Sequence, residues 1–330
     1  MAKNKPVKKV SVKKFQKVSF KKYAKRPKFT QKSVIAIVMV FAVLLLGVSG
    51  WAWWTKIVIN PDRVLSDAVA NSLQTNSVTR QVSQDDGQQE VDQTTYLSFY
   101  APTITAETTT KLSQKGAQRQ LTTITTDTIG SANSDYVRYT SVEGAENLPG
   151  AENFQKLLGI WAKKDADPSK GQPATFLNES LFSIVPVGNL KPEARGELLD
   201  LIKQKKLYKY DSAERKIENY RPVYEYRLSI KPADLIEVLA KYAELTGATD
   251  PEQFNPESYK DAPAVGIQIM VDIASRKIVK VQYGSSNRTE SFSGYNLYRE
   301  IKLPENTITI EELQQQLQGG SSEDNQNQSS

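Results

Sequence analysis

The first 55 residues constrain this chain more than any other part of it, because a basic tail runs directly into an uncharged apolar segment. Residues 1–32 carry 13 Lys and Arg side chains and no Asp or Glu, and no charge follows until Lys56. As a helix, residues 33–55 would measure ~35 Å, which exceeds the ~30 Å hydrocarbon core of a bilayer. The pattern therefore predicts one transmembrane helix over residues 33–55, crossing with a modest tilt.

The flanks of this segment predict which way it crosses. Positive charges are typical of the cytoplasmic side, and tryptophans are typical of the membrane–water interface. We expect a single-pass protein of the cell membrane, with its N-terminus in the cytoplasm and its C-terminal domain outside the cytoplasm. The residues assigned to the membrane interfaces are Arg26, Lys28 and Lys32 on the inner side and Trp51, Trp53 and Trp54 on the outer side.

A cleavable signal peptide is the alternative interpretation of the same segment. Val48, Ser49 and Gly50 would be the small residues before the cut. Signal peptides normally have a short basic region and an apolar region of about 7 to 15 residues. Here the basic region is much longer and tryptophans follow the apolar run, so an uncleaved anchor is favoured.

The distribution of charge along the sequence also predicts how the chain is divided into tails and a domain. We expect a disordered basic tail over residues 1–32, an extracytoplasmic α+β domain over residues 56–318 and a disordered polar tail over residues 319–330. The net charge is +6 for the whole chain and +13 for the basic tail, which leaves −7 for residues 33–330. The excess positive charge belongs to the tail, so nothing predicts a nucleic-acid partner for the ectodomain.

The lysines of the tail alternate with apolar side chains, as in Val7-Lys-Lys-Val10 and Phe20-Lys-Lys-Tyr23. Such a segment can contact the anionic inner leaflet or nucleic acid. The simpler interpretation is a disordered segment that only sets the topology.

Two missing residue types limit the chemistry. The chain has no cysteine and no histidine, which excludes disulfides, thiolate and imidazole metal ligands, and Ser-His-Asp catalysis. The lack of cysteine favours a bacterial cell envelope over a eukaryotic secretory pathway. The adjacent acids Asp85-Asp86 and Glu311-Glu312 lie where turns and helix starts use acids. We therefore expect no enzyme, no catalytic residue, no cofactor and no metal.

Hydrophobic periodicity predicts mixed helices and strands after the span. Residues 143–190 are the least regular stretch, with one short apolar element at 154–161. The expected helices are 61–73 with Asn60 as cap, 192–206, 232–246 with Gly247 as stop, and one after the Thr309–Glu312 capping box. The expected strands are 78–83, 91–100, 104–112, 118–127, 135–142, 208–217, 224–230, 267–273, 279–283 and 290–303.

Two stretches carry a family resemblance: Val223-Tyr-Glu-Tyr-Arg-Leu-Ser-Ile-Lys-Pro232, and Ile267-Gln-Ile-Met-Val-Asp-Ile-Ala-Ser-Arg-Lys-Ile-Val-Lys-Val281. With the leading helix and the run of strands, residues 61–318 resemble the half-barrel domain of bacterial lipoprotein carriers and mycobacterial lipoglycan-binding lipoproteins. The resemblance implies a curved antiparallel sheet packed around helices, with acyl chains in the cavity between them. A tethered version cannot ferry cargo, but it can take an acyl chain from the outer leaflet.

The resemblance implies a lipid or lipoconjugate ligand between the sheet and the helices. The candidate pocket-lining residues are Tyr224, Tyr226, Leu228, Ile230, Leu235, Leu239 and Tyr242. The same side chains can instead form a solid core. In that case the ectodomain would belong to a cell-envelope interaction or sensor protein with no small-molecule ligand.

Overall fold

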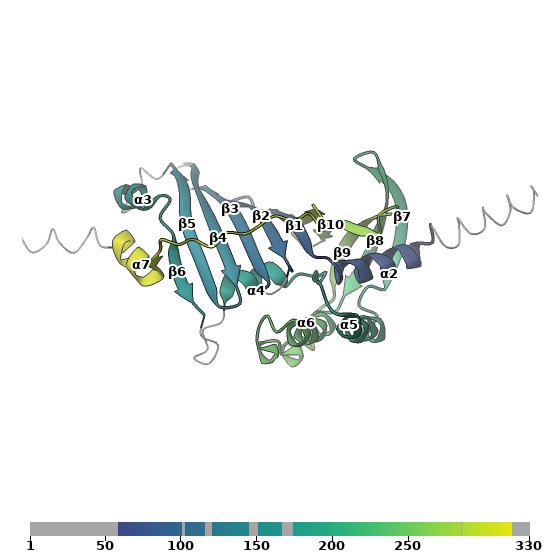
Figure 1. Cartoon of the computed structure of the whole chain (residues 1–330). Helices are drawn as coiled ribbons and strands as arrows, with labels where there is room; N and C mark the ends of the chain where they lie inside the picture. Colours follow the sequence, from purple (N-terminus) through teal and green to yellow (C-terminus); the bar gives the residue numbers. More distant parts are fainter. Residues whose placement is uncertain are drawn as a thin grey trace, which may run out of the picture. The chain divides into compact units, whose positions relative to one another are not determined.

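The described part of the chain folds around one open, twelve-stranded sheet (Figure 1). The computed structural model describes residues 59–100, 103–115, 121–144, 151–166, 174–284 and 286–318. The strands are β1 (Ser77–Asp85), β2 (Gln89–Ser98), β3 (Thr105–Lys115), β4 (Leu121–Ser131), β5 (Ser134–Glu143), β6 (Ala162–Asp165), β7 (Tyr210–Glu218), β8 (Arg221–Ile230), β9 (Val265–Asp272), β10 (Lys277–Tyr283), β11 (Arg288–Ser293) and β12 (Ile308–Thr309). Their order is β12-β6-β5-β4-β3-β2-β1-β11-β10-β9-β8-β7, and only the β12–β6 pair is parallel.

The expected tails and membrane span lie outside the described residues. This holds for the basic tail, for residues 33–55, for the six interface residues and for residues 319–330. No helix within the described ranges is long and apolar enough to cross a bilayer.

Helices pack on one face of the sheet. The helices are α2 (Pro61–Ser72), α3 (Ala151–Leu157), α4 (Thr175–Leu181), α5 (Pro192–Lys205), α6 (Pro232–Thr246) and α7 (Ile310–Gln318), with short 3-10 turns at Pro251–Gln253 and Pro256–Tyr259. α2 contacts β9 and β10, α4 contacts β2 to β5, and α5 packs against α6. The main core lies between these four helices and the sheet, and it joins Val64 of α2, Leu97 of β2, Leu177 of α4 and Ile269 of β9.

Most of the expected elements are confirmed. Asn60 caps α2 by accepting a hydrogen bond from the backbone N–H of Arg63 (3.1 Å). Gly247 ends α6 in the left-handed region with a φ of 63°. At the start of α7, Thr309 and Glu312 form the reciprocal capping box, with bonds of 2.7 Å and 3.1 Å. The α+β class with a mostly antiparallel sheet therefore holds, although the sheet is open and not strongly curled.

The expected strand over residues 290–303 is wrong in its second half. β11 ends at Ser293, and Gly294 and Asn296 then adopt positive φ values of 61° and 60°. The chain crosses the sheet from β11 towards α7 (Figure 1). It lies on the face opposite α4, since Arg299 pairs with Glu107 (2.6 Å), and Glu107 alternates with the core residue Ala106 on β3.

The interval 143–190 is more regular than its sequence suggests, because it contains α3, β6 and α4. α4 is too short to show a helical period, and a partner from a distant strand fixes its start. The Asp135 carboxylate of β5 accepts hydrogen bonds from the backbone N–H groups of Thr175 (2.6 Å) and Phe176 (3.3 Å). Burial raises the pKa of Asp135, and these two hydrogen bonds oppose the rise.

Gly130 on β4 allows α4 to approach the sheet. A Cβ atom at this position would lie 2.9 Å from the Cα atom of Leu177. We expect Gly130→Ala to lower the free energy of unfolding by about 1–3 kcal/mol, because the backbone of α4 must move. Gly196 within α5 has open space around it, so Gly196→Ala should instead raise that free energy by up to about 1 kcal/mol. Urea unfolding of the full chain in mild detergent measures both, and a neutral Gly130→Ala variant would contradict the close packing.

Candidate functional site

The seven residues proposed from the sequence to line a pocket lie mostly inside the core. Tyr226 and Tyr242 are fully buried, and Leu235 is half-buried. The four β8 residues, Tyr224, Tyr226, Leu228 and Ile230, join Tyr242 in the main core, and Leu239 is buried outside that cluster. The structure has a groove between α2 and α5, and none of the seven residues lines it.

Three tyrosines of β7 and β8 hold the residues at the start of α2; we call Tyr210, Tyr224 and Tyr226 the tyrosine clamp. The Tyr224 hydroxyl donates to the carbonyl of Ile59 (2.7 Å), and the Tyr226 hydroxyl donates to the carbonyl of Pro61 (2.7 Å). The Tyr210 hydroxyl donates to Oδ1 of Asp62 (2.6 Å). Tyr226 packs edge-on against Tyr210, with ring centroids 5.1 Å apart. The clamp fixes the backbone at the start of α2.

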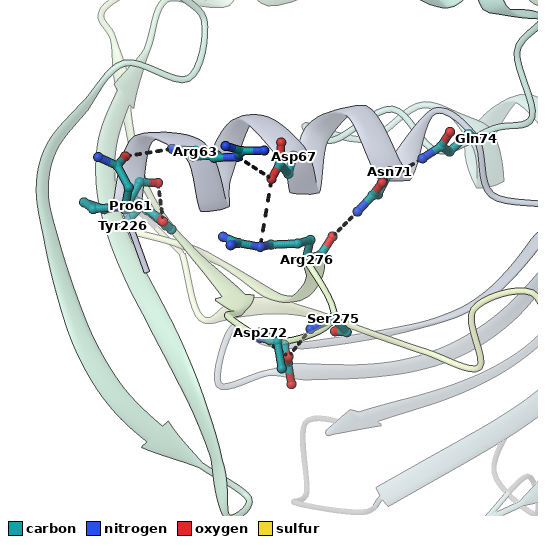
Figure 2. A network of polar contacts seen from close by, with 11 residues as sticks. Pro61, Arg63, Asp67, Asn71, Gln74, Tyr226, Asp272, Ser275 and Arg276 are labelled. Atoms are coloured by element: carbon teal, nitrogen blue, oxygen red, sulfur yellow. Dashed lines mark hydrogen bonds and ion pairs between the residues drawn. The ribbon is translucent and has the colours of Figure 1, made fainter. Parts of the chain in front are cut away.

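A polar network holds the length of α2 against the β9–β10 turn (Figure 2). The Asn71 side-chain amide donates to the carbonyl of Arg276 (2.9 Å), and the Arg276 guanidinium lies 3.9 Å from the Asp67 carboxylate. The turn itself is organised by Asp272, whose carboxylate accepts hydrogen bonds from the backbone N–H groups of Ala274 (3.0 Å) and Ser275 (2.8 Å). The clamp at one end of α2 and this network along its side therefore fix the position of the helix.

On its other side, α2 borders a groove of about 670 Å³ whose second wall is α5 and the chain leading into β7; we call it the α2–α5 groove. This volume lies within the range of small-molecule sites, roughly 300–1,000 Å³. The groove is lined by Asp62, Leu65, Ser66, Val69 and Ala70 of α2, by Leu199, Asp200, Ile202 and Lys203 of α5, and by Lys206, Tyr208, Lys209 and Tyr210 after it.

The floor of the groove is apolar and its edges are charged. Leu65, Val69 and Ile202 are buried, and Ala70 and Leu199 are half-buried. The edges carry three exposed lysines, Lys203, Lys206 and Lys209, and two exposed carboxylates, Asp62 and Asp200. An apolar chain would lie in such a groove with its polar end at the edge.

Tyr210 lines the α2–α5 groove and also belongs to the tyrosine clamp. Its ionisation at high pH should lower the free energy of unfolding. Burial, followed by the hydrogen bond to Asp62, raises the pKa of Tyr210 to about 12. The unfolded phenol loses its proton near pH 10, so this contribution to stability is complete below about pH 10 and is lost as the pH rises towards 12. Urea unfolding at pH 8 and at pH 11 measures the effect. Over this interval the free energy of unfolding of Tyr210→Phe should fall less than that of the parent protein. Equal losses in both proteins would contradict the raised pKa.

Lys206 ends α5 in a strained conformation. Its φ of 51° and ψ of 36° place it in the left-handed region, where helix ends usually have glycine. We expect Lys206→Gly to raise the free energy of unfolding by about 0.5–1 kcal/mol, because glycine adopts this conformation without strain. Lys203→Gly is the matched control and should destabilise by about 1 kcal/mol, because Lys203 lies inside the helix. Thermal unfolding of the two variants side by side checks the opposite signs.

The groove residues were missed by the sequence reasoning. The signal available was the spacing of Lys203, Lys206 and Lys209 at every third position around a helix end. The groove is lined by α2 and α5, which lie more than a hundred residues apart in the sequence, and no local pattern shows it. Within the described residues, no group of three acidic side chains is arranged to hold a metal ion.

No protein-family model matches the chain, and no curated protein matches it.

Proposed function

We propose that this protein is a membrane-tethered, extracytoplasmic binding protein that holds the apolar chain of a lipid or lipoconjugate in the α2–α5 groove. The observation that supports this most is the groove itself, which combines a volume of about 670 Å³ with an apolar floor and charged edges. Burying an acyl chain there contributes about 0.8 kcal/mol for each methylene removed from water. The proposal assigns the protein no catalytic role, no cofactor and no metal.

The short connection to the expected span supports a membrane-derived ligand. Seven residue steps separate Thr55, the end of that span, from Asp62 on the wall of the groove. Seven residues reach at most ~25 Å. In this proposal the chain is anchored once in a bacterial cell membrane with its N-terminus inside, and the ligand comes from the outer leaflet. The basic tail sets this topology and can contact the anionic inner leaflet.

The proposed site differs in place from that of the half-barrel lipid carriers that the chain resembles. In those proteins the cavity lies between sheet and helices. Here that space is occupied by buried side chains such as Tyr226, Tyr242 and Ile269. The ligand site proposed for this chain lies instead on the outer side of α2.

Native mass spectrometry tests the proposed function. The full chain, purified from membranes in mild detergent and released from the micelle, should carry the added mass of a bound lipid. Organic extraction of the same sample should yield that lipid in near-equimolar amount. A chain that emerges only at its own mass, and from which no lipid can be extracted, would show that the groove has no such ligand.

A second candidate function is an envelope interaction protein, and exposed apolar side chains favour it. Leu297, Tyr298 and Leu303 are 66%, 68% and 47% exposed on the segment that crosses the sheet face opposite α4. A photoreactive amino acid at position 298 should then crosslink to a partner protein in intact cells, while the same group at position 111 on β3 should not. Absence of a crosslinked protein at position 298 would remove this candidate.

A further inference from the structure

We propose that the α2–α5 groove selects a chain with an anionic headgroup, such as a carboxylate or a phosphate, and that Lys203, Lys206 and Lys209 bind that headgroup. This inference rests on the proposed function, because the apolar floor must first hold the chain. It goes beyond that function by assigning the headgroup charge and the residues that recognise it.

The three lysines belong to one short stretch of the chain that lines the groove. Lys203 is in the last turn of α5, Lys206 is its C-terminal cap, and Lys209 follows three residues later, just before β7. All three line the groove and are exposed, and none forms an ion pair or a hydrogen bond through its side chain with any described residue. By contrast, the neighbouring Lys205 does not line the groove, and it pairs with Glu237 of α6. Three ammonium groups are therefore available to a ligand.

The two carboxylates of the groove cancel only part of this charge. Asp62 is held by the Tyr210 hydroxyl (2.6 Å) on the α2 wall. Asp200 lies on α5, before the lysines. The edge of the groove thus carries one net positive charge, with the lysines gathered at the C-terminal end of α5.

The backbone at Lys206 supports a role for its charge. Glycine would relieve the positive φ of 51° at this position. A lysine there retains strain that the fold does not require, and sites of retained strain are commonly functional. If the cation matters, Lys206→Gly should stabilise the protein and weaken binding of the anionic ligand at the same time. A purely structural role for Lys206 predicts no such loss of binding.

The test uses a fluorescent reporter on the groove in the full chain, reconstituted in nanodiscs of zwitterionic phosphatidylcholine. Because the chain contains no cysteine, Ser66→Cys gives a single labelling site on the α2 wall. Four probes are titrated: laurate, dodecanol, lysophosphatidylglycerol and lysophosphatidylcholine. Inorganic phosphate alone is a fifth arm, which distinguishes a lipid headgroup from a free anion. Anionic-to-neutral affinity ratios are compared between variants in the same bilayer, so that partition of each probe into the lipid cancels.

We expect each anionic probe to bind about tenfold or more tightly than its partner of equal chain length and no net negative charge, a modest factor because the lysines are exposed. Lys203→Gln/Lys206→Gln/Lys209→Gln should bring this ratio close to unity. Lys111→Gln/Lys191→Gln/Lys302→Gln, at exposed sites away from the groove, should leave it unchanged. Raising the ionic strength from about 0.05 M to about 0.5 M should weaken only the anionic probes.

The possible failures are distinguishable. If both members of each pair bind the parent protein equally, the headgroup inference is overturned and the proposed function stands. If the anionic-to-neutral affinity ratio is unchanged in Lys203→Gln/Lys206→Gln/Lys209→Gln, the assignment to these lysines is overturned. If inorganic phosphate binds as tightly as the amphiphiles, the assignment to an amphiphile is overturned. If no probe shifts the reporter, the proposed function fails together with the inference.

Discussion

The full chain with Ala70→Trp should lose its bound lipid and remain folded. Ala70 lies on the α2 wall of the groove and is half-buried, so an indole there would occupy the volume that the ligand needs. Its fold should tolerate the change, because the side chain faces the groove and not the packed core. We expect the lipid adduct in native mass spectrometry to disappear, while the far-ultraviolet circular dichroism spectrum and the unfolding midpoint stay close to those of the parent.

Ala240→Trp is the matched control for this substitution. Ala240 is a half-buried alanine of a helix, as Ala70 is, but it lies on α6 and does not line the groove. It should retain the adduct. Equal retention of lipid by both variants would place the ligand elsewhere, for example around the expected membrane span, and equal loss would indicate a nonspecific effect of the added indole.

Replacing Tyr226 should have the largest effect on stability. Its side chain is fully buried on β8, its ring packs against Tyr210 and Tyr224, and its hydroxyl bonds to the carbonyl of Pro61. Tyr226→Ala should lower the free energy of unfolding by about 3–5 kcal/mol, because it leaves a cavity in the core. Tyr226→Phe keeps the ring and should cost about 1–3 kcal/mol, because the Pro61 carbonyl loses its partner.

Tyr220 provides a control of the same residue type. It is 100% exposed at the β7–β8 turn, so Tyr220→Ala should change the free energy of unfolding by less than about 0.5 kcal/mol. Denaturant unfolding followed by circular dichroism compares the variants. If Tyr226→Ala were as mild as Tyr220→Ala, Tyr226 would line a cavity rather than fill the core, and the pocket predicted from the sequence would be favoured.

Local sequence patterns predict most of the fold. Alternation on β8, β9 and β10 depends only on the period of a strand, and the turn between β1 and β2 has Gly87 at a φ of 88° directly after the adjacent acids Asp85-Asp86. Caps and stops such as Asn60 and Gly247 act within one helical turn, so they can be read directly. These signals define the elements and the inward faces of each.

The groove could not be predicted from the pattern of any single segment. Alternation shows that Tyr224 and Tyr226 point inward, but it does not show whether an inward face meets other side chains or an empty space. The answer depends on which helices cover the sheet, and the groove is lined by α2 and α5, which are distant parts of the chain. The end of β11 at Ser293 is a similar case, since the alternating apolar pattern continues past it although the chain then crosses the opposite face of the sheet, where Arg299 pairs with Glu107.

Photocrosslinking tests the central claim most directly. The full chain is reconstituted in nanodiscs that contain a phospholipid with a photoreactive diazirine on its acyl chain, illuminated, digested and mapped by mass spectrometry. A lipid chain held in the α2–α5 groove predicts crosslinks in the peptides that contain Leu65 to Ala70 and Leu199 to Lys203, and their loss with Ala70→Trp. Crosslinks confined to residues 33–55, with none in α2 or α5, would contradict the account.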